Sequence, residues 1–169
     1  MAVNTIGAGV VLNEGQIDVD LRVEGNSAEY LLMVDGSSDR VGIGVAAPST
    51  HLEIQGGLTT AGSVLTLSTK ETTVVANDVL GKINFQAPLE GSGTDAILPG
   101  ASIHAIATDT FAAANNETAL IFSTASSDAE LGSATSGAVF ERMRITSAGN
   151  VGIGATPIAA KLEIHGGSW

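Results

Sequence analysis

Two glycine-bearing turns of the sequence could bind a phosphate. Val41–Gly44 and Val151–Gly154 both read VGIG, and glycine-rich turns bind phosphates through backbone amides when a helix follows. The first turn continues to Ala47 with the looser dinucleotide spacing G-x-G-x-x-A, but Pro48 and a short strand pattern follow it instead of a helix. The second turn has Pro157 at the third position, which breaks the spacing. The glycines therefore favour tight turns or close approach of strands over nucleotide binding.

Other residue types that carry catalysis or hold metals are scattered along the chain. Asp18 and Asp20 fall on one face of a predicted strand, about 7 Å apart, as a glycosidase pair could, but no aromatic residue lines a sugar subsite nearby. The chain has no cysteine and no Gly-x-Ser-x-Gly motif. His51, His104 and His165 lie in separate strand patterns without the spacing of metal ligands. We therefore predict no catalytic, cofactor-binding or metal-binding residues and no enzyme activity; a ring of one histidine per chain around an ion is the weaker alternative.

The composition excludes further classes of protein. Glycine supplies 21 of 169 residues and aromatic residues only 4%, which suits thin, regular β-structure better than a thick core. Seven basic and 18 acidic residues give a net charge of −11, which argues against nucleic-acid partners and anionic membrane surfaces. The first residues lack the pattern of a signal peptide, and no apolar stretch approaches 18 residues. We expect a soluble protein without membrane insertion.

An internal repeat surrounds the two VGIG turns. An ungapped alignment of Tyr30–Gly57 with Phe140–Gly167 matches 11 of 28 positions. The matches comprise Met33 with Met143, Ser37 with Ser147, the VGIG, the Leu-Glu-Ile that follows, and a closing Gly-Gly. This clustering indicates a duplicated unit, in which Val41, Gly42, Ile43, Gly44, Val151, Gly152, Ile153 and Gly154 are structural residues.

Strand patterns fill most of the remaining sequence. Apolar and polar residues alternate strictly over Ile17–Glu24, and we predict further strands of this kind over 82–86, 103–106 and 119–123. Such strands have one apolar and one polar face. Thr50-x-x-Glu53 fits a helix capping box, but Gly56-Gly57 would end such a helix within two turns, so a strand is favoured there. We predict an all-β chain in three parts: an N-terminal β stem with the first repeat (1–57), a middle β module (58–138) and a C-terminal stem repeat (139–169).

These segments resemble phage tail-fibre proteins. The run Arg142–Gly154, followed by a proline and Lys161–Ile164, is similar to an "ERMRI-(T/D)-S-x-GNVGIGT-x-P-x-x-KLEV" pattern that recurs along such fibres. Val19–Glu24 together with 33–35 and 39–44 resembles a second segment of marine phage fibres. Three stretches of the middle module resemble a β module found between such segments; they are 80–85, 101–105 and 120–124.

The resemblance implies an elongated, intertwined homotrimeric β-fibre with a small β module between two stem repeats. It also implies a virion protein of the tail fibre, made in the host cytoplasm and extracellular once assembled, whose partners are its own copies and a host cell-surface glycan or protein. Such fibres often end in an intramolecular chaperone domain, whereas this sequence ends at Trp169. A fragment and a short protein that trimerises unaided both remain open.

Receptor contact is expected through two long polar loops of the middle module, 89–99 and 109–118, because such loops lack strand patterning. The candidate receptor residues are Glu90, Thr94, Asp95, Asp109, Asn115 and Asn116. The alternative function is a monomeric β-sandwich module that binds carbohydrate, although the single Trp and single Tyr argue against it. No cofactor is predicted.

Overall fold

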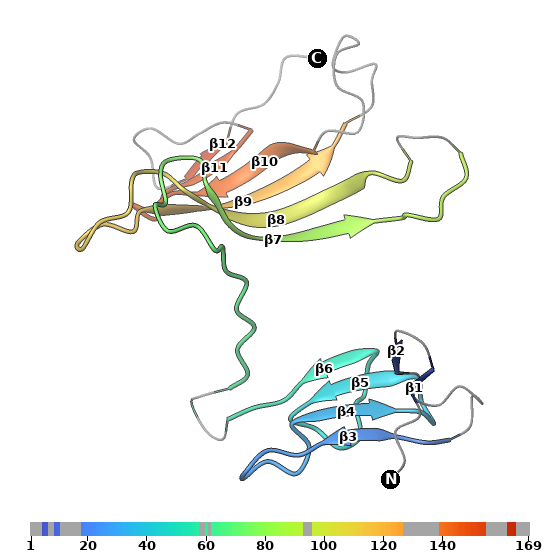
Figure 1. The fold of residues 1–169 in the computed structure, drawn as a ribbon. Helices are drawn as coiled ribbons and strands as arrows, with labels where there is room; N and C mark the ends of the chain where they lie inside the picture. Colours follow the sequence, from blue (N-terminus) through green and yellow to red (C-terminus); the bar gives the residue numbers. More distant parts are fainter. Residues whose placement is uncertain are drawn as a thin grey trace. The chain divides into compact units, whose positions relative to one another are not determined.

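The computed structural model divides the chain into two compact units, Met1–Thr66 and Leu67–Trp169. It describes residues 5–6, 9–10, 18–57, 60, 62–92, 96–126, 139–154 and 162–164. Every regular element within these ranges is a β-strand (Figure 1), which confirms the predicted all-β class for the described residues. These residues contain no helix able to cross a membrane.

The first unit contains a four-stranded sheet in the order β3-β4-β5-β6 (Figure 1). Its strands are β3 (Leu21–Val23), β4 (Leu32–Asp35), β5 (Arg40–Ile43) and β6 (Leu52–Ile54). The first three are antiparallel, and β6 runs parallel to β5. A separate two-stranded sheet pairs β1 (Thr5–Ile6) with β2 (Gly9–Val10).

The second unit contains one six-stranded sheet in the order β12-β11-β10-β9-β8-β7. Its strands are β7 (Val79–Gln86), β8 (Pro99–Ala107), β9 (Thr118–Ala125), β10 (Val139–Ile145), β11 (Val151–Ile153) and β12 (Leu162–Ile164). All neighbours are antiparallel except β11 and β12. The strands of the predicted middle module and of the predicted C-terminal stem therefore share one sheet, and the three-part division with boundaries after 57 and 138 stays a prediction.

The strand predicted over Ile17–Glu24 is shorter in the structure. Ile17 lies outside the described residues, and β3 covers only Leu21–Val23. Its partner β4 has four residues and ends at the turn that begins with Gly36. There the Asp20 side chain accepts a hydrogen bond from the Gly36 amide at 2.9 Å, so local turn contacts replace ladder pairing before Leu21.

The two VGI strands have the same neighbours. Each pairs antiparallel with the strand before it and parallel with the Leu-Glu-Ile strand after it, with Val41 opposite Leu52 and Val151 opposite Leu162. Residues 44–51 connect β5 to β6 without a helix, although parallel strands are usually joined by one. The alternation of the sequence indicated the strands, but it did not indicate this parallel crossover.

The hairpins before the two VGI strands differ by one residue in length. Asp35 pairs with Arg40 across a four-residue turn, whereas Ile145 pairs with Val151 across a five-residue turn. Because a shift of one residue moves side chains to the other face, Met33 and Met143 lie on opposite faces of their sheets. Their match in the ungapped alignment is therefore not a structural equivalence.

This difference in length keeps aliphatic residues on one face in both units. In the first unit that face holds only Val, Leu and Ile, and we call it the four-strand apolar face; its residues are Leu21, Val23, Leu32, Val34, Val41, Ile43, Leu52 and Ile54. In the second unit, the six-strand apolar face contains Phe85 and two registered rows of side chains. The rows are Ile83, Ile103, Phe122, Met143 and Ile153; and Ala105, Leu120, Ile145, Val151 and Leu162.

Few apolar side chains are buried. Among the described residues, the buried hydrophobic side chains are Met33, Ala107, Ala119 and Ile121. Strand β9 shows the pattern clearly, because Ala119, Ile121 and Ser123 are buried while Leu120 between them is 39% exposed. The face that also carries Lys82, Glu141 and Arg144 is thus covered at its centre, and the six-strand apolar face stays partly open to solvent.

Candidate functional site

The VGIG glycines are fixed by packing in the first unit. A side chain on Gly42 would come within 2.8 Å of Val45 and 3.2 Å of Pro48 from the crossover segment. Gly44 has φ +75, and a Cβ there would lie 2.1 Å from the Gln55 carbonyl oxygen. Gly154 has the same φ of +75 in the second copy. These positions favour glycine because of close backbone approach and a left-handed conformation.

The amides of these turns are already engaged in the sheets. The Gly44 amide donates to the Tyr30 carbonyl at 2.9 Å, and the Gly154 amide donates to the Arg142 carbonyl at 2.9 Å. A phosphate site needs several backbone N–H groups that point outward from a turn. Gly44 and Gly154 therefore offer no free amide for a phosphate, and the structural role of the VGIG residues stays a prediction.

The two predicted receptor loops lie at opposite ends of β8. One loop precedes Pro99 and the other follows Ala107 (Figure 1). Nine strand residues separate them, which corresponds to about 26 Å at the usual rise per residue. The structure therefore does not bring Glu90 together with Asp109, Asn115 and Asn116, so the two loops cannot form one contact surface within a chain.

The loop after β8 is organised by Asp109 and Asn115. The Asn115 side-chain amide donates to Asp109 Oδ2 at 2.9 Å and to the Thr110 carbonyl at 3.1 Å, while its oxygen accepts from the Glu117 amide. Asp109 Oδ1 also accepts from the Thr110 amide at 2.7 Å. Both side chains therefore hold the loop in shape, and Asn116 is the exposed candidate whose side chain has no partner among the described residues.

Neighbouring segments support this loop. The Phe111 amide donates to the Val74 carbonyl at 3.0 Å, and the Ser147 hydroxyl lies 3.4 Å from Glu117 Oε2. The β8–β9 loop, the segment before β7 and the β10–β11 turn thus meet at one end of the six-stranded sheet. Sequence spacing alone could not indicate this meeting, because it depends on the pairing of β10 with β9.

In the loop before β8, the Glu90 carboxylate bonds to its own loop. Glu90 accepts hydrogen bonds from the Ser92 amide and hydroxyl at 3.0 and 2.6 Å, and these bonds lower the pKa of its carboxyl. Its carboxylate is therefore already bonded within the loop. Thr94 and Asp95 lie outside the described residues.

The histidines and paired carboxylates do not converge. His51 is exposed, His165 lies outside the described residues, and His104 is half-buried on β8. Burial, and next the positive charge of Lys82, lowers the pKa of His104, and its Nδ1 is buried without a hydrogen-bond partner. Within the described part of the chain, no group of three or more His, Asp or Glu residues could hold a metal ion.

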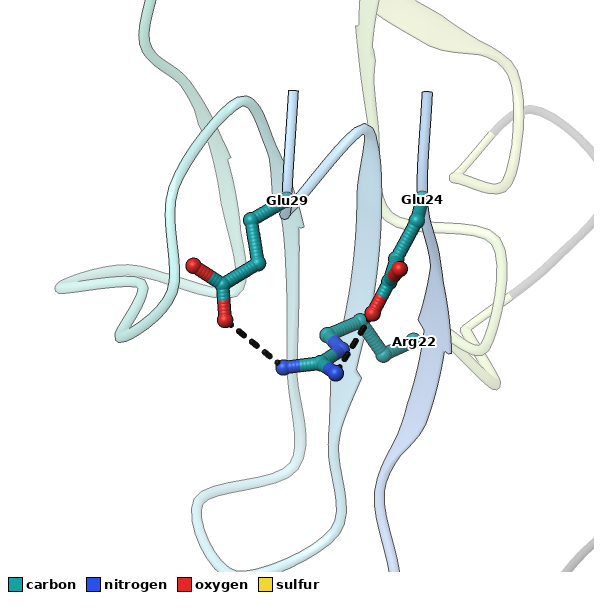
Figure 2. Close-up of polar contacts among 3 residues, drawn as sticks. All are labelled: Arg22, Glu24 and Glu29. Atoms are coloured by element: carbon teal, nitrogen blue, oxygen red, sulfur yellow. Dashed lines mark hydrogen bonds and ion pairs between the residues drawn. The ribbon is translucent and has the colours of Figure 1, made fainter. Parts of the chain in front are cut away.

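An arginine-centred cluster on β3 was not predicted from the sequence. Arg22 pairs with Glu29 at 3.0 Å and with Glu24 (Figure 2). Its guanidinium lies 5.3 Å from the Tyr30 ring centre. A shallow hollow of about 400 Å³ lies beside it, lined by Asp20, Arg22, Tyr30, Met33 and Ala46. Because two carboxylates already neutralise Arg22 and its guanidinium covers the aromatic ring, the hollow offers neither a free cation nor an open stacking surface.

Comparison with known proteins gives a limited result. No protein-family model matches the chain, and no curated protein matches it. Among solved structures, the carboxy-terminal domain of the bacteriophage T5 L-shaped tail fibre is similar at 17% identity with a TM-score of 0.44. The same domain with its intra-molecular chaperone domain is similar at 18% identity and the same TM-score.

These alignments cover 58% and 60% of this chain but only 35% and 26% of the T5 chains. The chain therefore spans about a third of the length of the first structure and about a quarter of the length of the second. At this identity and TM-score, the similarity by itself assigns neither fold nor function.

Proposed function

We propose that this chain is a non-catalytic structural and adhesion segment of a phage tail fibre that works as a homotrimer. The observation that carries the proposal is the scarcity of buried apolar side chains beside two open apolar sheet faces. Only Met33, Ala107, Ala119 and Ile121 are buried hydrophobic residues among those described. Single-layer sheets need a covered face to be stable, so the chain requires partners.

The trimeric state and the virion location rest on the resemblance of the sequence repeats to tail-fibre segments. On this account the protein is made in the host cytoplasm and is extracellular once assembled in the fibre. A monomeric β-sandwich would need a second sheet over each apolar face. Within the described residues, Phe85 and Leu162 on the six-strand apolar face remain 53% and 57% exposed, which does not favour that alternative.

A charge on the six-strand apolar face tests self-association. Ile83 on β7 is 44% exposed, so Ile83→Asp leaves the single unit able to fold but puts a carboxylate into the proposed contact. Burying an unpaired charge costs several kcal/mol, and we expect Ile83→Asp to dissociate the trimer, as measured by light scattering on a sizing column. The matched control is Asn84→Asp, which places the same charge at an exposed position on the opposite face of β7. Equal masses for both variants would contradict the proposal.

Receptor contact is proposed to centre on Asn116. Its exposed side chain is free of partners among the described residues, whereas Asp109 and Asn115 hold the loop together. Removing one hydrogen bond to a ligand costs about 1 kcal/mol, so Asn116→Ala should weaken binding to an array of bacterial surface polysaccharides about fivefold. Asn84→Ala, an exposed change away from the loop, should leave binding and trimer mass unchanged. A wild-type trimer that binds nothing on the array would remove the support for a glycan receptor.

A further inference from the structure

We propose that the two apolar faces are separate interfaces with a second copy of this chain, and that each packs on its own equivalent. The four-strand apolar face would contact the four-strand apolar face of a neighbouring copy, and the six-strand apolar face would contact its own counterpart. This inference rests on the proposed homotrimer and names the surfaces through which it forms.

Charged residues of both sheets lie on the faces opposite to the apolar faces, so the apolar faces are better suited to contact another copy. In the first unit, Arg22 and Glu53 lie in one row of the opposite face with Met33 and Gly42. In the second unit, Lys82 and Arg144 likewise lie on the face opposite to the apolar rows. A chain of net charge −11 repels its copies through polar surfaces, whereas the four-strand apolar face and the two registered rows of the six-strand apolar face carry no charge. Arg142 lies at one margin of the six-strand apolar face, where it donates to the Thr124 hydroxyl at 3.0 Å.

The edges of the sheets are less suited to pairing with another chain. Edge strand β3 has three residues and carries the Arg22–Glu24–Glu29 cluster (Figure 2). Edge strand β7 has irregular register at two places, between Val79 and Gly81 and between Phe85 and Gln86. Short edges, charges and bulges are the usual protection against edge-to-edge addition, so contact through the faces is favoured.

A second copy is the occupant that fits both faces at once. Each unit presents a Val-x-Ile strand beside a Leu-Glu-Ile strand in the same parallel register. Another copy of the chain carries both faces at the same separation in sequence, so binding at one face raises the effective concentration at the other. An unrelated partner would need two surfaces matched to the same spacing.

The side chains of the two faces favour packing of like on like. The four-strand apolar face contains only Val, Leu and Ile, whereas the six-strand apolar face includes Phe85, Phe122 and Met143. In a closed cyclic trimer, the same face of every copy can turn toward the threefold axis, so that like faces meet there. Pairing an aromatic face with the narrower aliphatic face would leave gaps or overlaps, which are destabilising in packed contacts.

Thiol accessibility tests whether the faces are covered. The chain has no cysteine, so each variant carries a single thiol in the full chain. We compare Leu52→Cys with His51→Cys in the first unit and Ile83→Cys with Asn84→Cys in the second; all four positions are exposed within one chain. We expect Leu52→Cys and Ile83→Cys to react with a maleimide at least about tenfold more slowly than their neighbours, because reaction requires the interface to open.

Cross-linking tests whether each apolar face contacts the same face of another copy. Val34→Cys and Leu120→Cys place thiols on the central strands β4 and β9 of the two faces. The two variants, each with a different affinity tag, are co-expressed and treated with a short bis-maleimide. We expect adducts within each variant and few between them. Mixed adducts in equal yield would overturn like-on-like packing.

The outcomes separate this inference from the proposed function. A trimer whose face cysteines react as fast as the control cysteines would overturn the interface assignment and leave the trimeric fibre standing. A monomer under all conditions would overturn both. Slow reaction of the face cysteines in a trimer, with adducts only between like positions, supports the assignment.

Discussion

At the scale of single residues, His104 is a half-buried group whose protonation the fold opposes. It lies in a row with Lys82, Ile121 and Arg144 on the covered face of the six-stranded sheet. The described carboxylate nearest in register is Glu141, which is already bonded to Arg144 at 2.5 and 2.6 Å. Strand β9 contributes no charge to this neighbourhood, so a protonated His104 would lack a free counter-ion among the described residues.

The lowered pKa of His104 predicts a loss of stability in acid. Its folded pKa lies below the ordinary 6.5 because of burial first and Lys82 second. The unfolded chain then binds more protons than the folded chain as the pH falls below 6.5, so the free energy of unfolding decreases over that range. Thermal unfolding between pH 7.5 and 5 should show this slope, and His104→Gln should flatten it. His51→Gln, at an exposed position, is the control; an unchanged slope in His104→Gln would contradict the assignment.

Residue-level prediction from the sequence was limited to residue type and position in the chain. The amides of Gly44 and Gly154 are engaged in the sheets, and the structural role predicted for the VGIG residues stays a prediction. The receptor candidates were chosen by polarity and loop position, and that choice could not separate Asn115, whose amide is bonded within its loop, from Asn116, whose side chain is free among the described residues. The difference depends on side-chain geometry, which composition does not reveal.

At the scale of elements, the crossover between β5 and β6 explains the glycines. Gly42→Ala would put a methyl group within 2.8 Å of Val45, and Gly44→Ala would add a clash with the Gln55 carbonyl to a φ of +75. We expect Gly42→Ala to destabilise the first unit by about 1–3 kcal/mol, and Gly44→Ala to destabilise it more, as measured by chemical unfolding. Gly91→Ala, where nothing lies within 4 Å, should change the stability little. Equal effects at Gly42 and Gly91 would contradict the packing of the crossover.

Most strands could be predicted because apolar and polar residues tend to alternate along a strand even in a thin sheet. The patterns over 82–86, 103–106 and 119–123 fall within β7, β8 and β9. Thr50 and Glu53 resemble a capping box, and Glu53 does accept two hydrogen bonds from Ser49, but the segment pairs with β5 as strand β6. An ungapped alignment hides the one-residue difference in length between the two hairpins. The sequence does indicate this difference, because the apolar residues Met143 and Ile145 correspond to Leu32 and Val34, one position away from the ungapped alignment.

At the scale of the whole molecule, the central feature is apolar surface that one unit does not cover. Val34, Ile43 and Leu52 on the four-strand apolar face are 37%, 40% and 59% exposed. Burying a fully exposed aliphatic side chain contributes about 1.5–3 kcal/mol, so covering each of these partly exposed side chains contributes a part of that amount, and the contributions of a whole face add up. Alternation predicted that the strands need partners, but the identity of those partners came from resemblance alone.

The most direct test of this account is the solution mass of the unmodified chain, measured by light scattering on a sizing column over a range of concentrations. One chain has a mass of 16.9 kDa, and a homotrimer would have three times that mass, 50.7 kDa. We expect a mass near the trimer value that does not change on dilution. A stable, folded species at 16.9 kDa would contradict the account, because it would mean that one chain is stable without partners to cover its apolar faces.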